Sequence, residues 1–292
     1  MGLKSEVRLA LELYKKNFFN DIKKVLDLGS QDILLTYDQF KFYLYQSGLE
    51  FDSKDFDQLK SFPNKKGFSS KYLWNLLGIK NYQCSDINSM NNSKFLDLNK
   101  NNTINEKYDL VTDFGNNEHV FNIIKAYENM HDLCNENGYL WISQAVTRGN
   151  GFFTFDQSFF EGMAMANNYK ILYSAYIVGY KTFKNKDQNI ENAIHFHVPC
   201  NKNMLESLNF NNINYLGITY LFQKTNSNSF NYFYQYNYDK DQEKKFYDLN
   251  FVIDPFDISR MYIPSSKSIN STSTKELLSI LIKRILKKIK IN

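Results

Sequence analysis

The chain has 292 residues, and with 43% hydrophobic residues it can bury a substantial core in one large domain or two small ones. Its net charge is +4, but the segment from Ser271 onward, with six basic residues and one acidic residue, accounts for all of this excess. The rest of the chain has no positive excess, so we expect no nucleic-acid partner. The longest apolar stretches fall short of the roughly 18 to 20 residues that span a bilayer, and Met1–Glu6 lacks the apolar core of an export signal. A cytoplasmic location is therefore predicted.

The cysteines and histidines give no metal or disulfide pattern. Cys84, Cys134 and Cys200 are far apart and form no CxxC pair, which favours reduced thiols. His195 and His197 flank Phe196 and could offer two ligands from one side of a strand, but no third ligand stands at a recognisable spacing. We expect no metal.

The first half of the chain predicts a helix, a strand and an interrupted crossover. Apolar residues at helical spacing over 7–18 precede the short strand 25–28, which ends in a turn at Gly29. The segment from about residue 35 to residue 68 is polar and aromatic, and we interpret it as a helical insertion after this strand. A helix capped by Ser69 or Ser70 then runs to Leu77, and a second strand covers 82–86.

The second half alternates strands and helices. A weak strand is expected at 95–96, a clearer one at 108–112, a helix from near Glu118 to about Cys134, and a strand at 139–143. A helix over 159–167 and strands over 169–178 and 215–223 follow. This alternation predicts an α/β fold with a Rossmann-like, mainly parallel sheet and helices on both faces. The predicted domain covers 1–225, followed by an irregular aromatic and polar extension over 226–270 and a basic amphipathic helix over 271–292.

The strand and turn at Val25-Leu26-Asp27-Leu28-Gly29-Ser30 form the most informative motif. Backbone amides beside a glycine at the end of a strand can approach a nucleotide-like ligand closely; the alternative is that Gly29 only enables a turn after a buried strand. The motif resembles that of class I S-adenosylmethionine-dependent methyltransferases, an acidic residue, a hydrophobic residue and a glycine after strand one. The resemblance implies that Asp27 helps to hold the methionine part of S-adenosylmethionine, and that Gly29 and Ser30 let the cofactor pass. Further glycines of the family are absent at Gln31 and its neighbours.

Two more segments match the family's cofactor motifs. Asp86, followed by Ile87, ends the second predicted strand, where one carboxylate can accept both ribose hydroxyls. A surface aspartate that only ends a strand is the alternative. Phe95-Leu96-Asp97-Leu98 resembles the third motif, which implies that Asp97 faces the adenine amino group and that Leu98 packs beside the ring; the alternative is a loop aspartate.

The candidate catalytic segment runs from Asp113 and Phe114 to His119. By resemblance it lies beside the reactive sulfonium and the acceptor, so Asp113 and Phe114 are counted with the cofactor site. Glu118 or His119 could remove an acceptor hydroxyl proton, because histidine titrates near neutrality and burial raises a carboxylate towards it. The alternative is that these residues only cap and pack the following helix.

The resulting hypothesis is an S-adenosylmethionine-dependent methyltransferase that acts on a small-molecule or sugar acceptor, with O-methylation favoured. An NAD-dependent oxidoreductase is one alternative, although the GxGxxG fingerprint is missing. A noncatalytic binding or scaffold protein that keeps the fold is another. For the basic helix over 271–292, packing on the body and peripheral contact with an anionic membrane or a protein partner both stay open.

Overall fold

A computed structural model of the chain describes residues 2–35, 68–89, 92–147, 151–180, 195–201 and 213–233, with isolated positions between 40 and 48 and between 205 and 208. By contacts between residues the chain divides into two units, 1–257 and 258–292, and all described residues lie in the first. The predicted insertion lies almost wholly outside the described residues, as do most of 226–270 and the whole of 271–292.

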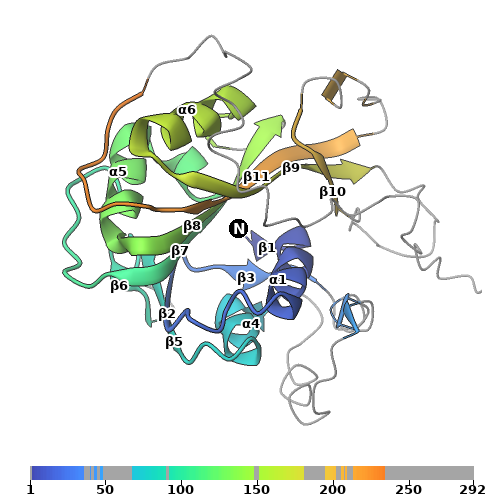
Figure 1. The fold of residues 1–292 in the computed structure, drawn as a ribbon, viewed down its shortest axis with the longest axis horizontal. Coiled ribbons are helices and arrows are strands. Elements are labelled where there is room, and N and C mark those ends of the chain that lie inside the picture. Colours follow the sequence, from blue (N-terminus) through green and yellow to red (C-terminus); the bar gives the residue numbers. More distant parts are fainter. Residues whose placement is uncertain are drawn as a thin grey trace, which may run out of the picture. The chain divides into compact units, whose positions relative to one another are not determined.

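An eight-stranded sheet forms the centre of the described part, in the order β10-β9-β11-β8-β7-β2-β5-β6 (Figure 1). Its strands are β2 Lys24–Leu28, β5 Asn81–Asp86, β6 Lys94–Phe95, β7 Tyr108–Phe114, β8 Cys134–Thr147, β9 Lys170–Tyr180, β10 His195–Pro199 and β11 Ile213–Gln223. Each strand expected from the sequence is present, with β8 extended at both ends.

Five neighbouring strands pair in parallel, in the spatial order β6-β5-β2-β7-β8. Numbered by their order in the chain, these strands read 3-2-1-4-5, which is the order of a doubly wound sheet. The order reverses between β2 and β7, so this is the topological switch point, where open α/β sheets bind ligands at the carboxyl ends of their strands. The expected Rossmann-like, mainly parallel sheet is confirmed.

The other side of the sheet departs from an all-parallel order. β11, the last strand described, lies between β8 and β9 and is antiparallel to both, and β10 is antiparallel to β9. The antiparallel strands could not be recognised from hydrophobic pattern alone, because strand direction leaves the pattern unchanged.

Helices cover both faces of the sheet, with α5 (Ile123–Leu133) and α6 (Gln157–Asn167) on one side and α1 (Ser5–Lys15) and α4 (Ser70–Leu76) on the other (Figure 1). Side chains of β2 point alternately to the two faces of the sheet, so this strand contacts helices on both. Leu26 and Leu28 join the apolar cluster formed with α5 and α6, whereas Asp27, between them, contacts α4.

The helix predicted from near Glu118 is wrong in its start. A short 3₁₀ helix, η2, covers Asn117–His119, Val120 is extended, and α5 begins only at Ile123. Asn122 explains the break, because its Oδ1 accepts the N–H of Lys125 at 3.3 Å and so caps α5. The break places His119 at the end of η2, ahead of α5.

A second, three-stranded sheet crosses the region after β2. β1 (Gly2–Leu3) pairs in parallel with β3 (Asp32–Ile33), which pairs antiparallel with β4 (Phe68–Ser69). The N-terminal residues are thereby tied to the segment that follows the glycine turn.

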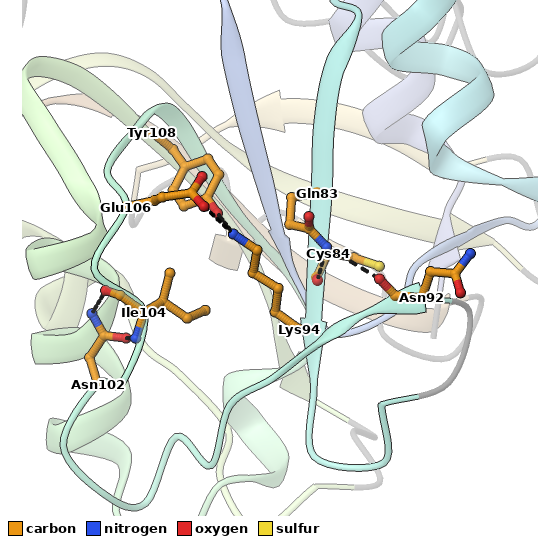
Figure 2. A network of polar contacts seen from close by, with 8 residues as sticks. All are labelled: Gln83, Cys84, Asn92, Lys94, Asn102, Ile104, Glu106 and Tyr108. Carbon is orange, nitrogen blue, oxygen red and sulfur yellow. Dashed lines mark hydrogen bonds and ion pairs between the residues drawn. The ribbon is translucent and has the colours of Figure 1, made fainter.

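The edge strand β6 is held by a polar network shown in Figure 2. Lys94 Nζ donates to Glu106 Oε1 at 2.7 Å and to the Tyr108 hydroxyl at 3.2 Å, which joins β6 to β7 across the loop between them. This network fixes the backbone that leads into Leu96, Asp97 and Leu98. None of the helices in the described ranges is both long and apolar enough to cross a membrane.

Candidate functional site

The candidate site lies at the carboxyl ends of β2, β5, β7 and β8. Two strands that flank the switch point end in glycines with positive φ, Gly29 at 79° and Gly115 at 72°. The Gly29 N–H donates to the Ser85 carbonyl and the Gly115 N–H to the Ser143 carbonyl, both at 2.7 Å. The turns after β2 and β7 are therefore fixed to the neighbouring strands.

The two turns contact each other. A Cβ added to Gly29 would stand 2.8 Å from Asn116 Oδ1 and 3.1 Å from Gln31 Nε2. Gln31 Nε2 donates to the Leu28 carbonyl at 3.1 Å, while its Oε1 is buried and has no hydrogen-bond partner among the described residues. Beside the glycine turn there is therefore a buried acceptor that lacks a donor.

Asp27 is fully buried, and its carboxylate accepts hydrogen bonds from the protein itself. Ser70 Oγ donates at 2.6 Å, Trp74 Nε1 at 3.3 Å, and Thr112 Oγ1 donates to the other oxygen. Burial raises the pKa of Asp27, and these donors act in the opposite sense. Its contact with a cofactor stays a prediction, and in this structure its carboxylate joins β2, α4 and β7.

Asp86 stands at the end of β5, next to the glycine turn, although 56 positions separate it from Ser30. Its Oδ2 accepts the Ser30 N–H at 3.2 Å and its Oδ1 the Asn88 N–H at 3.3 Å. The half-buried carboxylate keeps further acceptor capacity, because each oxygen has two lone pairs. Ile87 beside it is 61% exposed and offers an apolar surface next to this carboxylate.

The third predicted cofactor segment follows β6, beside the end of β5, and its side chains contact the protein itself. Asp97 pairs with Lys100 at 3.1 Å and accepts the Asn99 N–H at 3.1 Å, and these contacts lower its pKa. Leu98 is buried in the cluster under α5. Phe114 is also buried and packs edge-on against Trp141, with ring centroids 5.1 Å apart. Contacts of Leu98 and Phe114 with a cofactor, which stay predictions, would involve backbone rather than these side chains.

Asp113 organises the loop after β7. It is fully buried, and its Oδ1 accepts the N–H groups of Asn116 at 3.0 Å and Asn117 at 3.1 Å, while Gln144 Nε2 donates to its Oδ2. Burial raises the pKa of Asp113 to about 7, and the charge of Glu118 acts in the same direction. The loop that carries Glu118 and His119 therefore depends on this carboxyl group.

Glu118 and His119 form an unequal pair. The Glu118 side chain is almost buried, and its Oε2 accepts the Ala145 N–H at 2.9 Å, whereas 36% of the His119 side chain is exposed. His119 Nε2 lies 3.6 Å from Glu118 Oε1. Burial raises the pKa of Glu118. The His119 imidazole therefore reaches solvent, and the Glu118 carboxylate next to it is held by the Ala145 N–H.

The sequence did not reveal a layer of buried polar side chains beneath this pair. Asn117 and Tyr127 are buried, as is Gln144, and the Asn117 amide atoms, the Tyr127 hydroxyl and Gln144 Oε1 have no hydrogen-bond partner in the described part. The two amides lie close enough to the hydroxyl to oppose the strong rise that burial causes in the pKa of Tyr127. Polar residues at apolar positions of α5 and β8 are the only signal for this layer in the sequence.

His195 and His197, the candidate metal ligands, have other contacts. His195 stacks on Tyr215 with centroids 5.0 Å apart, and His197 Nδ1 lies 2.8 Å from the Tyr173 hydroxyl. Burial lowers the pKa of His195 to about 4 and of His197 to about 3. Among the described residues no group of three or more histidines, cysteines or carboxylates could hold a metal ion.

Comparisons with known proteins find solved structures with low sequence identity and low TM-scores. No family model matches the chain, and no curated protein does. TehB from Haemophilus influenzae is 17% identical over 76% of this chain and 62% of its own, with a TM-score of 0.38. A putative methyltransferase from Bacillus halodurans is 9% identical over 74% and 99%, with a TM-score of 0.40. An O-methyltransferase of a Brevibacillus brevis multienzyme, bound to S-adenosyl-L-homocysteine, is 16% identical over 75% and 71%, with a TM-score of 0.38. The chain thus spans less than two thirds of the length of TehB.

The glycine turn can be tested against a matched glycine. Gly78 has a φ of 87° like Gly29, but a Cβ on Gly78 would meet nothing within 4 Å. We expect Gly78→Ala to lower the free energy of unfolding by about 1 kcal/mol, the cost of a positive φ. Gly29→Ala should cost roughly 2 to 3 kcal/mol, because Asn116 must also move. Urea denaturation measures both, and equal losses would contradict the contact between the turns.

The buried Asp113 predicts a pH dependence. Because its folded pKa of about 7 lies above the usual 3.8, its stabilising contribution is full below about pH 4 and is lost as pH rises to 7. Asp113→Asn cannot ionise, and Gln144 can turn its unpartnered Oε1 towards the new amide. We expect this variant to fold and its unfolding free energy to fall less steeply between pH 4 and 7. Parallel slopes for both proteins, measured by urea denaturation, would show that Asp113 does not titrate there.

Proposed function

We propose that this chain is an S-adenosylmethionine-dependent methyltransferase that methylates a hydroxyl group of a small-molecule or sugar acceptor. The observation that carries the proposal is the glycine turn at the switch point of the sheet, with Asp86 on one side and the unpartnered Gln31 oxygen on the other. The topology alone would allow several cofactors.

The residues at the turn fit the parts of this cofactor. Asp86 has acceptor capacity left for the two ribose hydroxyls, and the exposed Ile87 offers an apolar surface to the adenine. Gln31 Oε1 would accept from the ammonium of the methionine part. Gly29 carries no side chain, and this lets Asn116 approach the turn at which the cofactor would bind.

A dinucleotide fits this turn less well. Dinucleotide sites place the pyrophosphate on free amides at the start of the helix that follows the first strand. Here the first amides near α4 are occupied: the Ser70 N–H donates to the Gln31 carbonyl at 3.1 Å, and the Lys71 N–H to Ser69 Oγ at 3.3 Å. The NAD-dependent alternative is therefore disfavoured.

The chemistry needs one positioned base at most. When bound, S-adenosylmethionine supplies a methyl group on a positively charged sulfur, and its transfer to a hydroxyl oxygen leaves S-adenosylhomocysteine and a proton. His119 is the exposed member of the pair and would accept that proton as the new C–O bond forms. Glu118, fixed by the Ala145 N–H, would orient the imidazole and stabilise its charged form. Alignment of acceptor and cofactor would supply most of the rate.

Calorimetric titration tests the cofactor assignment. We expect S-adenosylmethionine and S-adenosylhomocysteine to bind with micromolar Kd, and NAD not to bind. Asp86→Asn should weaken both about 10- to 100-fold, because hydrogen bonds to a charged acceptor are lost. Asp132→Asn, at an exposed position of α5, serves as control and should bind normally. Absence of binding to both methyl cofactors would favour the noncatalytic alternative.

The role of His119 is tested by S-adenosylhomocysteine formation with a panel of hydroxyl acceptors. His119→Gln should lower kcat about 100-fold or more without changing cofactor affinity, because a general base is removed. Added imidazole should restore part of the rate. His195→Gln removes a histidine that stacks on Tyr215 and is the control. An unchanged kcat in His119→Gln would assign catalysis to alignment alone.

A further inference from the structure

Two large aromatic side chains are exposed beside the candidate base. Phe121 is 77% exposed and Phe152 is 69% exposed, and their rings meet edge to face with centroids 6.2 Å apart. They come from different loops, after β7 and after β8, and Phe121 follows His119 by two residues. Single exposed phenylalanines are common, but a contacting pair at the ligand-binding edge of a sheet indicates a binding surface.

Both rings stand on fixed backbone. The Phe152 N–H donates to the Glu118 carbonyl at 2.7 Å, and the Phe153 N–H donates to the same carbonyl at 3.3 Å. A Cβ on Gly151 would stand 2.4 Å from the Glu118 carbonyl oxygen, so only glycine permits this approach of the two loops. The Asn122 N–H is held by Asn99 Oδ1 at 2.9 Å on the other side. The rings are therefore presented to solvent by a rigid frame, at little further entropic cost on binding.

The chemistry around the rings defines the ligand. Residues 120–122 and 151–155, which carry the two rings, contain no acidic or basic side chain. The two rings lie at an interplanar angle of 88° and form a corner with aromatic faces and edges, which a third ring can enter by stacking on one and meeting the other edge to face. A saturated group would gain only buried area there.

We propose that Phe121 and Phe152 form a specificity surface for the aromatic ring of a phenolic acceptor, whose hydroxyl group they hold towards His119. This inference rests on the proposed function for the identity of the ligand as an acceptor. It narrows the acceptor class from hydroxyl compounds in general to planar aromatic ones, and the ring recognition itself can be measured without cofactor.

The test compares 1-naphthol with decahydro-1-naphthol, which has the same carbon skeleton and hydroxyl group but no aromatic ring. Their Kd values are measured by saturation-transfer NMR with and without S-adenosylhomocysteine. We expect wild-type protein to bind 1-naphthol about tenfold more tightly than the saturated alcohol. Phe121→Leu and Phe152→Leu, which stay apolar but lose the ring, should each weaken 1-naphthol about five- to tenfold and leave decahydro-1-naphthol unchanged.

Controls separate ring recognition from folding and from the cofactor. Phe18→Ala removes a half-buried ring near the start of β8, where Phe18 contacts Tyr139, and should leave both affinities unchanged once the fold is verified by circular dichroism. The inference would be overturned if the two alcohols bound equally, or if the leucine variants weakened both equally. Tighter binding of methyl glucoside, a sugar acceptor, than of 1-naphthol would also overturn it. Failure to bind S-adenosylhomocysteine would overturn the proposed function, whereas ring-dependent binding of 1-naphthol would still identify the aromatic site.

Discussion

The buried carboxylate of Asp27 is the contact on which the site depends. It joins three elements that are distant in sequence, because Ser70 and Trp74 come from α4 and Thr112 from β7. A carboxylate without these donors would be costly to bury, so the strand, the helix and the neighbouring strand have to assemble together. Gly29 is two residues further along, and the turn it forms is held in place by this anchor.

A second layer of buried polar groups supports the loop after β7. Asp113 fixes the backbone of η2, and Glu118 fixes its own position through the backbone of β8. The loop after β7 has to be rigid and also accessible, and different residues meet these two requirements. The buried carboxyl groups give rigidity, and the exposed His119 keeps access to solvent and to a ligand. Such preorganisation reduces the reorganisation that catalysis requires.

The sequence predicted those features that depend on local pattern. A short apolar strand followed by glycine placed the turn correctly, and the helix that Ser70 begins and the aspartate that ends β5 were found across the insertion. The start of α5 was predicted too early, because Val120 fits the apolar spacing of the helix although its backbone is extended, and the cap at Asn122 decides the boundary. The contacts of Asp27 and of Gln144 could not be predicted, since they follow from strand register and from residues on other elements. The direction of β11 was hidden because the hydrophobic pattern of a strand is the same in both directions.

The position of β11 affects how the chain is made as well as how it is folded. This strand fills a place between β8 and β9, both of which leave the ribosome earlier. At about 5 to 20 residues per second, β8 and β9 wait on the order of a few seconds before their common partner is synthesised. During that interval each has an unpaired edge rich in aromatic and branched residues, which is prone to pair with another chain. The interval between the synthesis of β9 and that of β11 is therefore the period in which the nascent chain is most prone to pair with another chain.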